Sequence, residues 1–86
     1  MSGYNVEKEI EHLVHEMKRI GGSSGTCTFG QLFHDDKIQN LLESLVGTMK
    51  AAKKRKVIDF QGELLLQGVH DKVEVKLLQP DFKASQ

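Results

Sequence analysis

Apolar residues recur every three or four positions in the first quarter of the chain, which is the spacing of one helix face. They are Val6, Ile10, Leu13, Val14, Met17 and Ile20. Asn5 can cap the first turn of such a helix, and Gly21 with Gly22 can end it. The pattern therefore predicts a first helix over residues 6–20.

A short second helix is predicted after a β-prone run at 26–28. Thr28 and Gln31 have the spacing of a capping box, in which each side chain binds the other residue's backbone amide. This signature places the second helix at roughly Phe29–His34.

Asp36 and Gln39 repeat the capping signature and predict a third helix that continues to about Lys54. Its apolar side would consist of Ile38, Leu41, Leu42, Leu45, Met49 and Ala52. Its outward side would consist of Asn40, Glu43, Gly47, Lys50, Ala51 and Lys54. On that outward side, the glycine and the alanine would leave a flat strip between two lysines.

Strand patterns replace helix patterns after residue 56. Residues 57–60 are typical of an extended segment, and 64–66 would continue it as a strand. Residues 73–77 alternate apolar and charged side chains, which is typical of a half-buried strand. The loop between these strands is predicted at 67–72, and Pro80 ends the fold.

Three helices, a minor strand after the first helix and a C-terminal hairpin follow the order of a winged-helix domain. We therefore predict an α+β, winged-helix-like fold with a small antiparallel sheet, in which the C-terminal β-hairpin forms the wing. A chain of 86 residues has room for one hydrophobic core. The predicted organisation is a flexible N-terminus at 1–5, one domain at 6–79 and a flexible tail at 80–86.

Positive charge is concentrated in one block, although the whole chain has no net charge. Residues 1–49 carry seven acids and four bases, 50–56 carry five bases and no acid, and 57–86 carry five acids and three bases. Basic side chains at the C-terminal end of a helix contribute about 0.3–1 kcal/mol each to its stability. Five bases exceed what that role needs, so we predict that this region binds a partner. The predicted surface comprises Gly47, Lys50, Ala51, Lys53, Lys54, Arg55 and Lys56, with Val69, His70 and Lys72 of the predicted loop as a second candidate region.

Nucleic acid is the alternative partner for a basic block on a winged-helix-like domain. Three features disfavour it: the overall neutrality, Glu43 on the outward face, and Asp71 beside Lys72 in the wing. Phosphate binding usually recruits several bases across a whole face. We therefore expect a protein partner, with a winged-helix nucleic-acid-binding protein as the alternative.

Known catalytic and metal-binding spacings are missing. His12 and His15 lie one helical turn apart and precede Glu16, but neither His-Glu-x-x-His nor His-x-x-Glu-His occurs. Asp35 and Asp36 fit helix capping better than cation binding. We predict no catalytic residue, no metal and no cofactor.

The location of the protein is predicted from its single cysteine and its hydropathy. Cys27 has no partner for an internal disulfide, which fits a reducing compartment, most simply the cytosol. No apolar run approaches the roughly 18 residues of a membrane span. The polar N-terminus is not typical of a secretory signal. We therefore expect a cytoplasmic protein without membrane association.

Three blocks of the sequence resemble the costars family. They are FGQLFHDD at 29–36, LVGTMKAAKKRK at 45–56 and GELLLQGVHD at 62–71. The blocks occur in the expected order and with tight spacing, and the resemblance covers roughly Val6 to Leu78.

The costars family consists of small stand-alone proteins similar to the C-terminal actin-binding domain of the striated-muscle activator of Rho signalling. The resemblance implies a winged-helix-like fold and a cytosolic, cytoskeleton-associated protein that affects actin organisation and cell motility without enzymatic activity. The implied partner is actin or an actin-regulating protein, and no contact residues are carried over. We expect a monomer, which is small enough to enter the nucleus passively.

Overall fold

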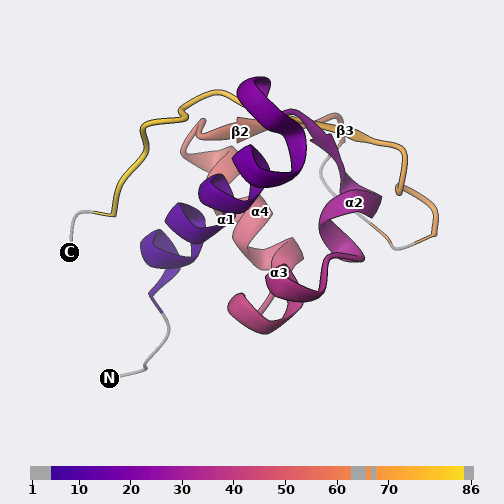
Figure 1. Ribbon diagram of the computed structural model, residues 1–86, viewed down its shortest axis with the longest axis horizontal. Helices are drawn as coiled ribbons and strands as arrows, with labels where there is room; N and C mark the ends of the chain where they lie inside the picture. The colour runs from indigo at the N-terminus through magenta and orange to yellow at the C-terminus, as the bar shows by residue number, and fades with distance from the viewer. Residues whose placement is uncertain (1–4, 63–65, 67, 85–86) are drawn as a thin grey trace.

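The structure is a computed structural model that describes residues 5–62, 66 and 68–84. Across this part of the chain, helices and short strands form a mixed α+β fold (Figure 1). In chain order the elements are α1 (Val6–Gly21), the 3-10 turn η1 (Gly22–Ser24), β1 (Cys27–Thr28), α2 (Phe29–Phe33), α3 (Asp36–Leu41), α4 (Leu45–Lys54), β2 (Ile58–Asp59) and β3 (Glu74–Leu77).

Helix α1 confirms the first predicted helix and lies across the front of α4 (Figure 1). The Asn5 side chain accepts the Lys8 amide at 3.1 Å, as a helix N-cap does. Gly22 ends the helix with a φ of 73°, in a region that glycine adopts without steric cost. The buried face of α1 packs against α3, α4 and β1 and so forms one wall of the core.

The prediction of one long third helix is wrong, because the chain forms two helices, α3 and α4, between Asp36 and Lys54. At Leu42 the backbone is extended, with φ −104° and ψ 139°, and the Leu42 side chain points into the core. Ser44 then starts α4 as a new N-cap, and its hydroxyl accepts the Gly47 amide at 3.0 Å. Gly47 therefore lies in the first turn of α4 and not in the middle of a long helix.

Glu9 of α1 holds the break between the two helices. Its Oε1 accepts the backbone amide of Glu43 at 3.0 Å, inside the linker, and the hydroxyl of buried Thr48 at 3.4 Å. A carboxylate that satisfies a linker amide removes the need for that amide to bond within a continuous helix. The contact joins residues 34 positions apart in the chain.

The capping box of α2 is confirmed. The Thr28 hydroxyl accepts the Gln31 amide at 3.2 Å, and the Gln31 side chain accepts the Thr28 amide at 2.8 Å. The helix ends at Phe33, one residue before the predicted end.

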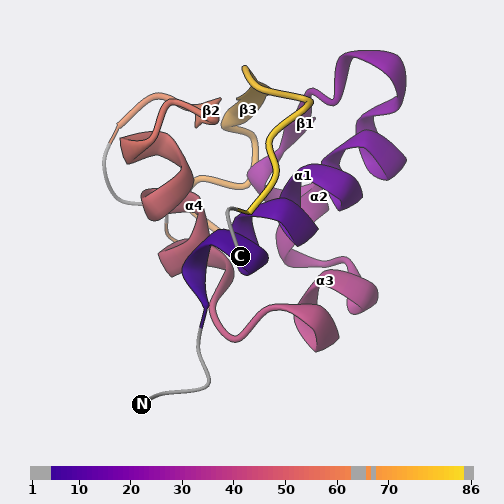
Figure 2. The same ribbon diagram turned by 90° about the vertical axis from the view of Figure 1, so that its left-hand side faces the viewer.

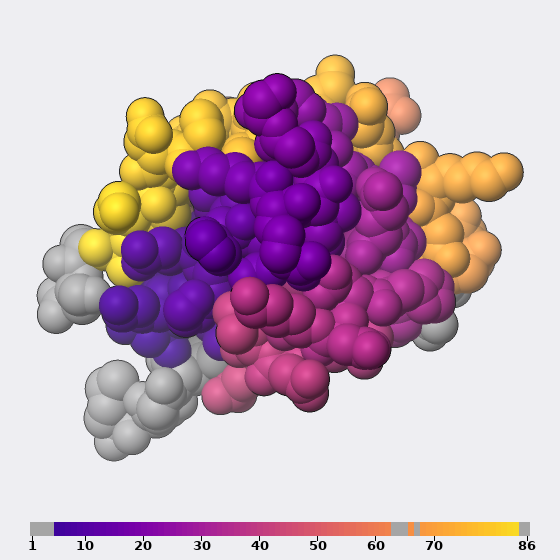
Figure 3. Space-filling model, in the orientation of Figure 1, coloured from indigo at the N-terminus to yellow at the C-terminus, as the bar shows by residue number. Residues whose placement is uncertain are grey.

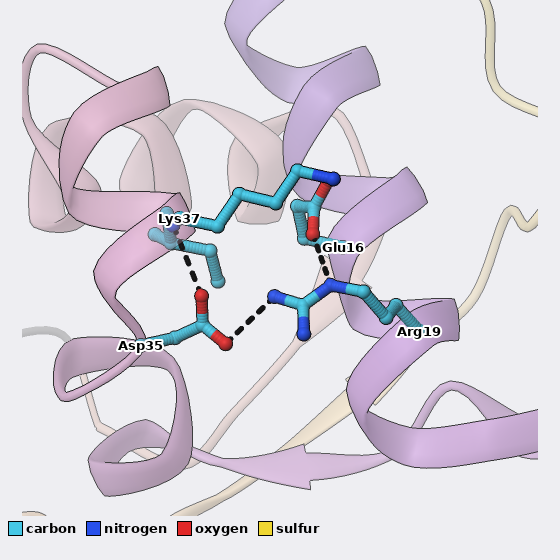
Figure 4. A network of polar contacts seen from close by, with 5 residues as sticks. Glu16, Arg19, Asp35 and Lys37 are labelled. Atoms are coloured by element: carbon cyan, nitrogen blue, oxygen red, sulfur yellow. Dashed lines mark hydrogen bonds and ion pairs between the residues drawn. The ribbon is translucent and has the colours of Figure 1, made fainter.

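A network of charged side chains joins the C-terminal half of α1 to the start of α3 (Figure 4). The Arg19 guanidinium donates to buried Glu16 at 2.5 Å and to Asp35 at 2.6 Å. Lys37 approaches the second oxygen of Glu16 at 3.7 Å. Asp35 is also the N-cap of α3, where its Oδ1 accepts the Ile38 amide at 3.1 Å. The predicted start of this helix is thus corrected by one residue, from an Asp36 cap to an Asp35 cap.

The three strands form an antiparallel sheet in the order β1-β3-β2. Cys27 pairs with Val75, and Ile58 pairs with Leu77. The predicted alternation in β3 is confirmed, because Val75 is buried whereas its charged neighbours are exposed. Of the strand predicted at 64–66, only Leu66 is among the described residues, where it is exposed and outside any strand.

The core lies between the helices and the inner face of the sheet. Its buried apolar residues are Ile10, Leu13, Val14, Met17, Cys27, Phe29, Leu32, Ile38, Leu42, Met49, Ala52, Val57, Ile58, Phe60 and Val75. Phe82 also packs against this core, and the Ala84 amide donates to Glu11 at 3.3 Å. Phe82 and Ala84 thus contact the domain from within the tail predicted at 80–86, and Asn5, in the terminus predicted at 1–5, caps α1 as the sequence predicts.

We predict that Ser44→Ala lowers the free energy of unfolding by about 1 kcal/mol, because the first turn of α4 loses its cap. Ser44→Asn is the matched control, since asparagine is an equally good N-cap residue. Urea denaturation followed by circular dichroism measures both variants. Equal stability of the alanine variant and the parent would contradict a capping role for this hydroxyl.

We predict that Asp35 makes stability depend on pH below about 4. The hydrogen bond from Arg19 lowers the pKa of Asp35 below its ordinary value of 3.8, so the folded state resists protonation more than the unfolded chain does. The resulting stabilisation is present above the unfolded-state pKa and is lost as pH falls through the folded-state pKa.

Asp35→Asn keeps an N-cap but loses the ion pair, so its stability should fall less steeply on acidification than that of the parent. Asp35→Ala should lose about 1 kcal/mol more than the asparagine variant at neutral pH. Denaturation between pH 2 and pH 7 tests both expectations. Parallel pH profiles for the parent and the asparagine variant would refute the ion-pair contribution.

Candidate partner-binding surface

The predicted basic block forms the last turns of α4 and the tight turn into β2. Figure 2 shows this end of α4 adjoining β2. The Val57 amide donates to the Ala52 carbonyl at 2.9 Å, which closes the turn. Lys56 has a φ of 60°, in the left-handed region where glycine is the usual residue at a helix end. The Gln79 side chain donates to the Lys56 carbonyl at 3.0 Å and holds the turn from outside.

A surface groove of about 540 Å³, here called the lysine groove, lies at this end of α4. It is lined by Lys50, Lys53, Lys54, Lys56 and Phe60. Among the residues that the structure describes, the ammonium groups of Lys50, Lys54 and Lys56 have no acidic or hydrogen-bonding partner. These three lysines are also exposed to solvent. The groove therefore carries positive charge that no described acidic residue neutralises.

Lys53 differs from the other lysines of the groove because its ammonium group is used inside the fold. Its Nζ donates to the carbonyls of Phe60 at 2.6 Å and Gly62 at 2.5 Å. The same nitrogen lies 4.3 Å from the centroid of the Phe60 ring, within the range of a cation–π contact. Lys53 therefore holds the chain directly after β2. Its ammonium group is less available to a partner than those of the other three lysines of the groove.

A second groove of about 510 Å³, here called the sheet groove, lies over the outer surface of β2 and β3. Its lining consists of Asp59, Phe60, Gln61, Val69, Lys72, Val73, Glu74 and Lys76. Phe60 lines both grooves, so they adjoin at its ring. Val69 lies in the loop before β3, which projects at one end of the molecule (Figures 1 and 3), and is 71% exposed.

The ten predicted surface residues fall into three groups. Lys50, Lys53, Lys54 and Lys56 line the lysine groove, and Val69 and Lys72 line the sheet groove. Gly47, Ala51, Arg55 and His70 line neither groove.

The four residues outside the grooves each contact a residue close to them in the chain. A β-carbon on Gly47 would lie 3.0 Å from the capping oxygen of Ser44, so this glycine is tied to the start of α4. Arg55 donates to the Ala51 carbonyl at 3.2 Å, at the end of the same helix. The Nδ1 atom of His70 accepts the Leu66 amide at 2.9 Å within the loop. The flat strip predicted from Gly47 and Ala51 is therefore not part of either groove.

Phe60 joins the two grooves, and the sequence prediction did not include it; Asp59, Gln61, Val73, Glu74 and Lys76 of the sheet groove were not predicted either. Phe60 is 5% exposed and counts as a core residue. An aromatic residue directly after a short strand is a weak signal, because most such residues are simply buried. Its position between the grooves depends on the Lys53 contacts, which are formed across seven residues of the chain.

The thiol and the possible metal ligands were the remaining candidate groups for chemistry. Burial raises the pKa of the Cys27 thiol to about 11, which keeps it protonated at neutral pH. Within the described ranges, no group of three or more histidine, cysteine or acidic side chains is placed to hold a metal ion. In the same part of the chain, no helix is both long and apolar enough to span a membrane.

Comparison with known proteins shows the family. The Costars family model matches residues 5–78, and the chain therefore belongs to the Costars family. The family resemblance drawn from the three sequence blocks is confirmed.

Relatives from animals and plants match over most of their length. The Costars family protein ABRACL of Xenopus laevis is 60% identical over 79 residues, which cover 87% of this chain and 98% of the relative. A Costars family protein of Picea sitchensis is 52% identical over 86 residues, which cover 95% of this chain and 90% of the relative. These names state the family and no catalytic activity.

A solved structure supports the fold. The solution structure of the human HSPC280 protein is 51% identical in sequence and superimposes with a TM-score of 0.76. The match covers 88% of this chain and 94% of the human chain. The mixed α+β arrangement of helices around a small antiparallel sheet is thus shared with an experimentally determined relative.

We predict that Lys53→Gln lowers the free energy of unfolding by about 1–2 kcal/mol, because two backbone carbonyls lose a charged donor. Lys54→Gln is the matched control, since this exposed neighbour should change stability by less than about 0.5 kcal/mol. Thermal and urea denaturation compare the two variants. If both variants were equally stable, the Lys53 contacts would not hold the segment after β2.

Proposed function

We propose that this Costars family protein is a non-catalytic protein-interaction module that regulates the actin cytoskeleton and cell motility. Its partner is actin or an actin-binding protein, and it acts in the cytoplasm, associated with the cytoskeleton, as a monomer. The link to actin rests on the resemblance of the family to the actin-binding domain of the striated-muscle activator of Rho signalling. The winged-helix-like character of the fold is part of this proposal, and the strand order β1-β3-β2 with the helices placed before β2 supports it.

The observation that carries the proposal is the unneutralised charge of the lysine groove. Lys50, Lys54 and Lys56 are exposed beside a groove and have no acidic partner among the described residues. Lys56 also occupies a backbone conformation that favours glycine, so the turn carries a charged side chain at some cost in conformational energy. Basic surface of this kind attracts an acidic protein surface and raises the rate of association.

We predict that the full chain binds actin and that charge reversal in the lysine groove weakens the binding. The N-terminus carries the fluorescent label, because the one cysteine is buried. Monomeric and filamentous actin are titrated separately at about 0.15 M salt. The double variant Lys50→Glu with Lys54→Glu should reduce affinity about tenfold or more, mainly through a slower association rate.

The matched control reverses two exposed lysines of α1, Lys8 and Lys18, which lie outside both grooves. This control should keep the parent affinity. If neither form of actin binds, and an actin-depleted cytoskeletal extract yields no actin-regulating protein either, the proposed function is wrong.

A winged-helix nucleic-acid-binding protein is the second candidate, favoured by the same lysines. A DNA duplex is therefore titrated alongside actin. At about 0.15 M salt, one compact basic block should give only weak and non-specific duplex binding. Sub-micromolar, sequence-selective binding would reverse the order of the two candidates.

A further inference from the structure

The two grooves that adjoin at Phe60 differ in charge. Among the described residues, the lysine groove is lined by four basic side chains and no acidic one. The described lining of the sheet groove has two acids, Asp59 and Glu74, and two bases, Lys72 and Lys76, which sum to a formal charge of zero. Asp59 and Lys76 are direct partners across β2 and β3, where opposite charges attract. The two parts of this surface therefore favour different chemical groups.

The neutral part of the surface carries exposed apolar area. Val69 is 71% exposed, and it lines the sheet groove together with Phe60 and half-buried Val73. Single exposed apolar residues are common on proteins. Here, however, the exposed valine is joined by two further apolar side chains in one groove, which gives an incoming apolar side chain several contacts at once.

The acidic side chains of the sheet groove would repel the phosphates of a nucleic acid. A nucleic acid that followed the surface from the lysine groove would bring its phosphates close to Asp59 and Glu74. A polypeptide can instead place carboxylates at one end and an uncharged side chain at the other. The charge pattern therefore favours a protein segment.

We propose that the surface binds an acidic segment of a partner protein, with its carboxylates in the lysine groove and an apolar side chain against Val69 in the sheet groove. This inference rests on the proposed function and specifies the chemistry of the partner. A short segment is long enough, because the two grooves adjoin at Phe60. Eight extended residues reach about 26 Å, which matches the middle dimension of a molecule of 35 × 26 × 24 Å.

Two labelled synthetic peptides test the proposal on the full chain. One has five glutamates, two glycines and two leucines, and the other has two serines in place of the leucines. Fluorescence anisotropy at about 0.15 M salt gives the affinities. The leucine peptide should bind about tenfold more tightly than the serine peptide, because part of its leucine surface is removed from water.

Variants assign each half of the peptide to its groove. Val69→Ser should cut the tenfold preference for leucine to about threefold or less, without changing the affinity for the serine peptide. Lys50→Glu with Lys54→Glu should weaken both peptides by about tenfold. Leu41→Ser is the matched control, because this α3 residue is 36% exposed and lies outside both grooves. Melting curves confirm that each variant is folded.

The outcomes separate this inference from the proposed function. Equal binding of the two peptides would overturn the apolar contact, while the actin titration would still decide the proposed function. Failure of both peptides to bind, or tighter binding of an inositol polyphosphate or a DNA duplex than of the leucine peptide, would overturn the acidic segment as occupant. Peptide binding without actin binding would support this surface and remove actin as its partner.

Discussion

The direction of α4 depends on one carboxylate of α1, that of Glu9. It accepts the Glu43 amide in the linker and the hydroxyl of buried Thr48 in α4, so it ties both sides of the helix break to α1. Because the chain breaks there, Leu42 can enter the core and α4 can turn back beneath α1. The last turn of α4 is thereby brought to β2, where its lysines meet Phe60.

Elements with local signals were predictable from the sequence. The Asn5 cap and the capping box of Thr28 and Gln31 each act within three residues, and the structure confirms them. The alternation around Val75 identified β3 for the same reason, because a half-buried strand repeats every two residues. The break at Leu42 was missed, although Ser44 offers a local N-cap signal, because the apolar spacing continues through it and the contact with Glu9 joins residues far apart in the chain.

For the candidate surface too, features of the local sequence were predictable, whereas contacts that depend on the fold were not. The density of bases at 50–56 is visible in the sequence, and the structure places most of that block around one groove. The different role of Lys53 is not visible there, because it depends on where the Phe60 and Gly62 carbonyls lie. Gly47 and Ala51 lie in α4 together with Lys50 and Lys54, but only the two lysines line the groove. Which side chains of one helix line a groove depends on the neighbouring chain around Phe60 and not on the helical spacing alone.

The ammonium group of Lys53 has a consequence for the behaviour of this protein at high concentration. A small sheet that ends in a two-residue strand leaves backbone acceptors near its border, and free acceptors of this kind can recruit strands from other chains. The carbonyls of Phe60 and Gly62 are already occupied by a charged donor, which an incoming strand would have to displace. These two carbonyls, which lie just after the edge strand β2, are therefore less available to a strand of another chain than free carbonyls would be.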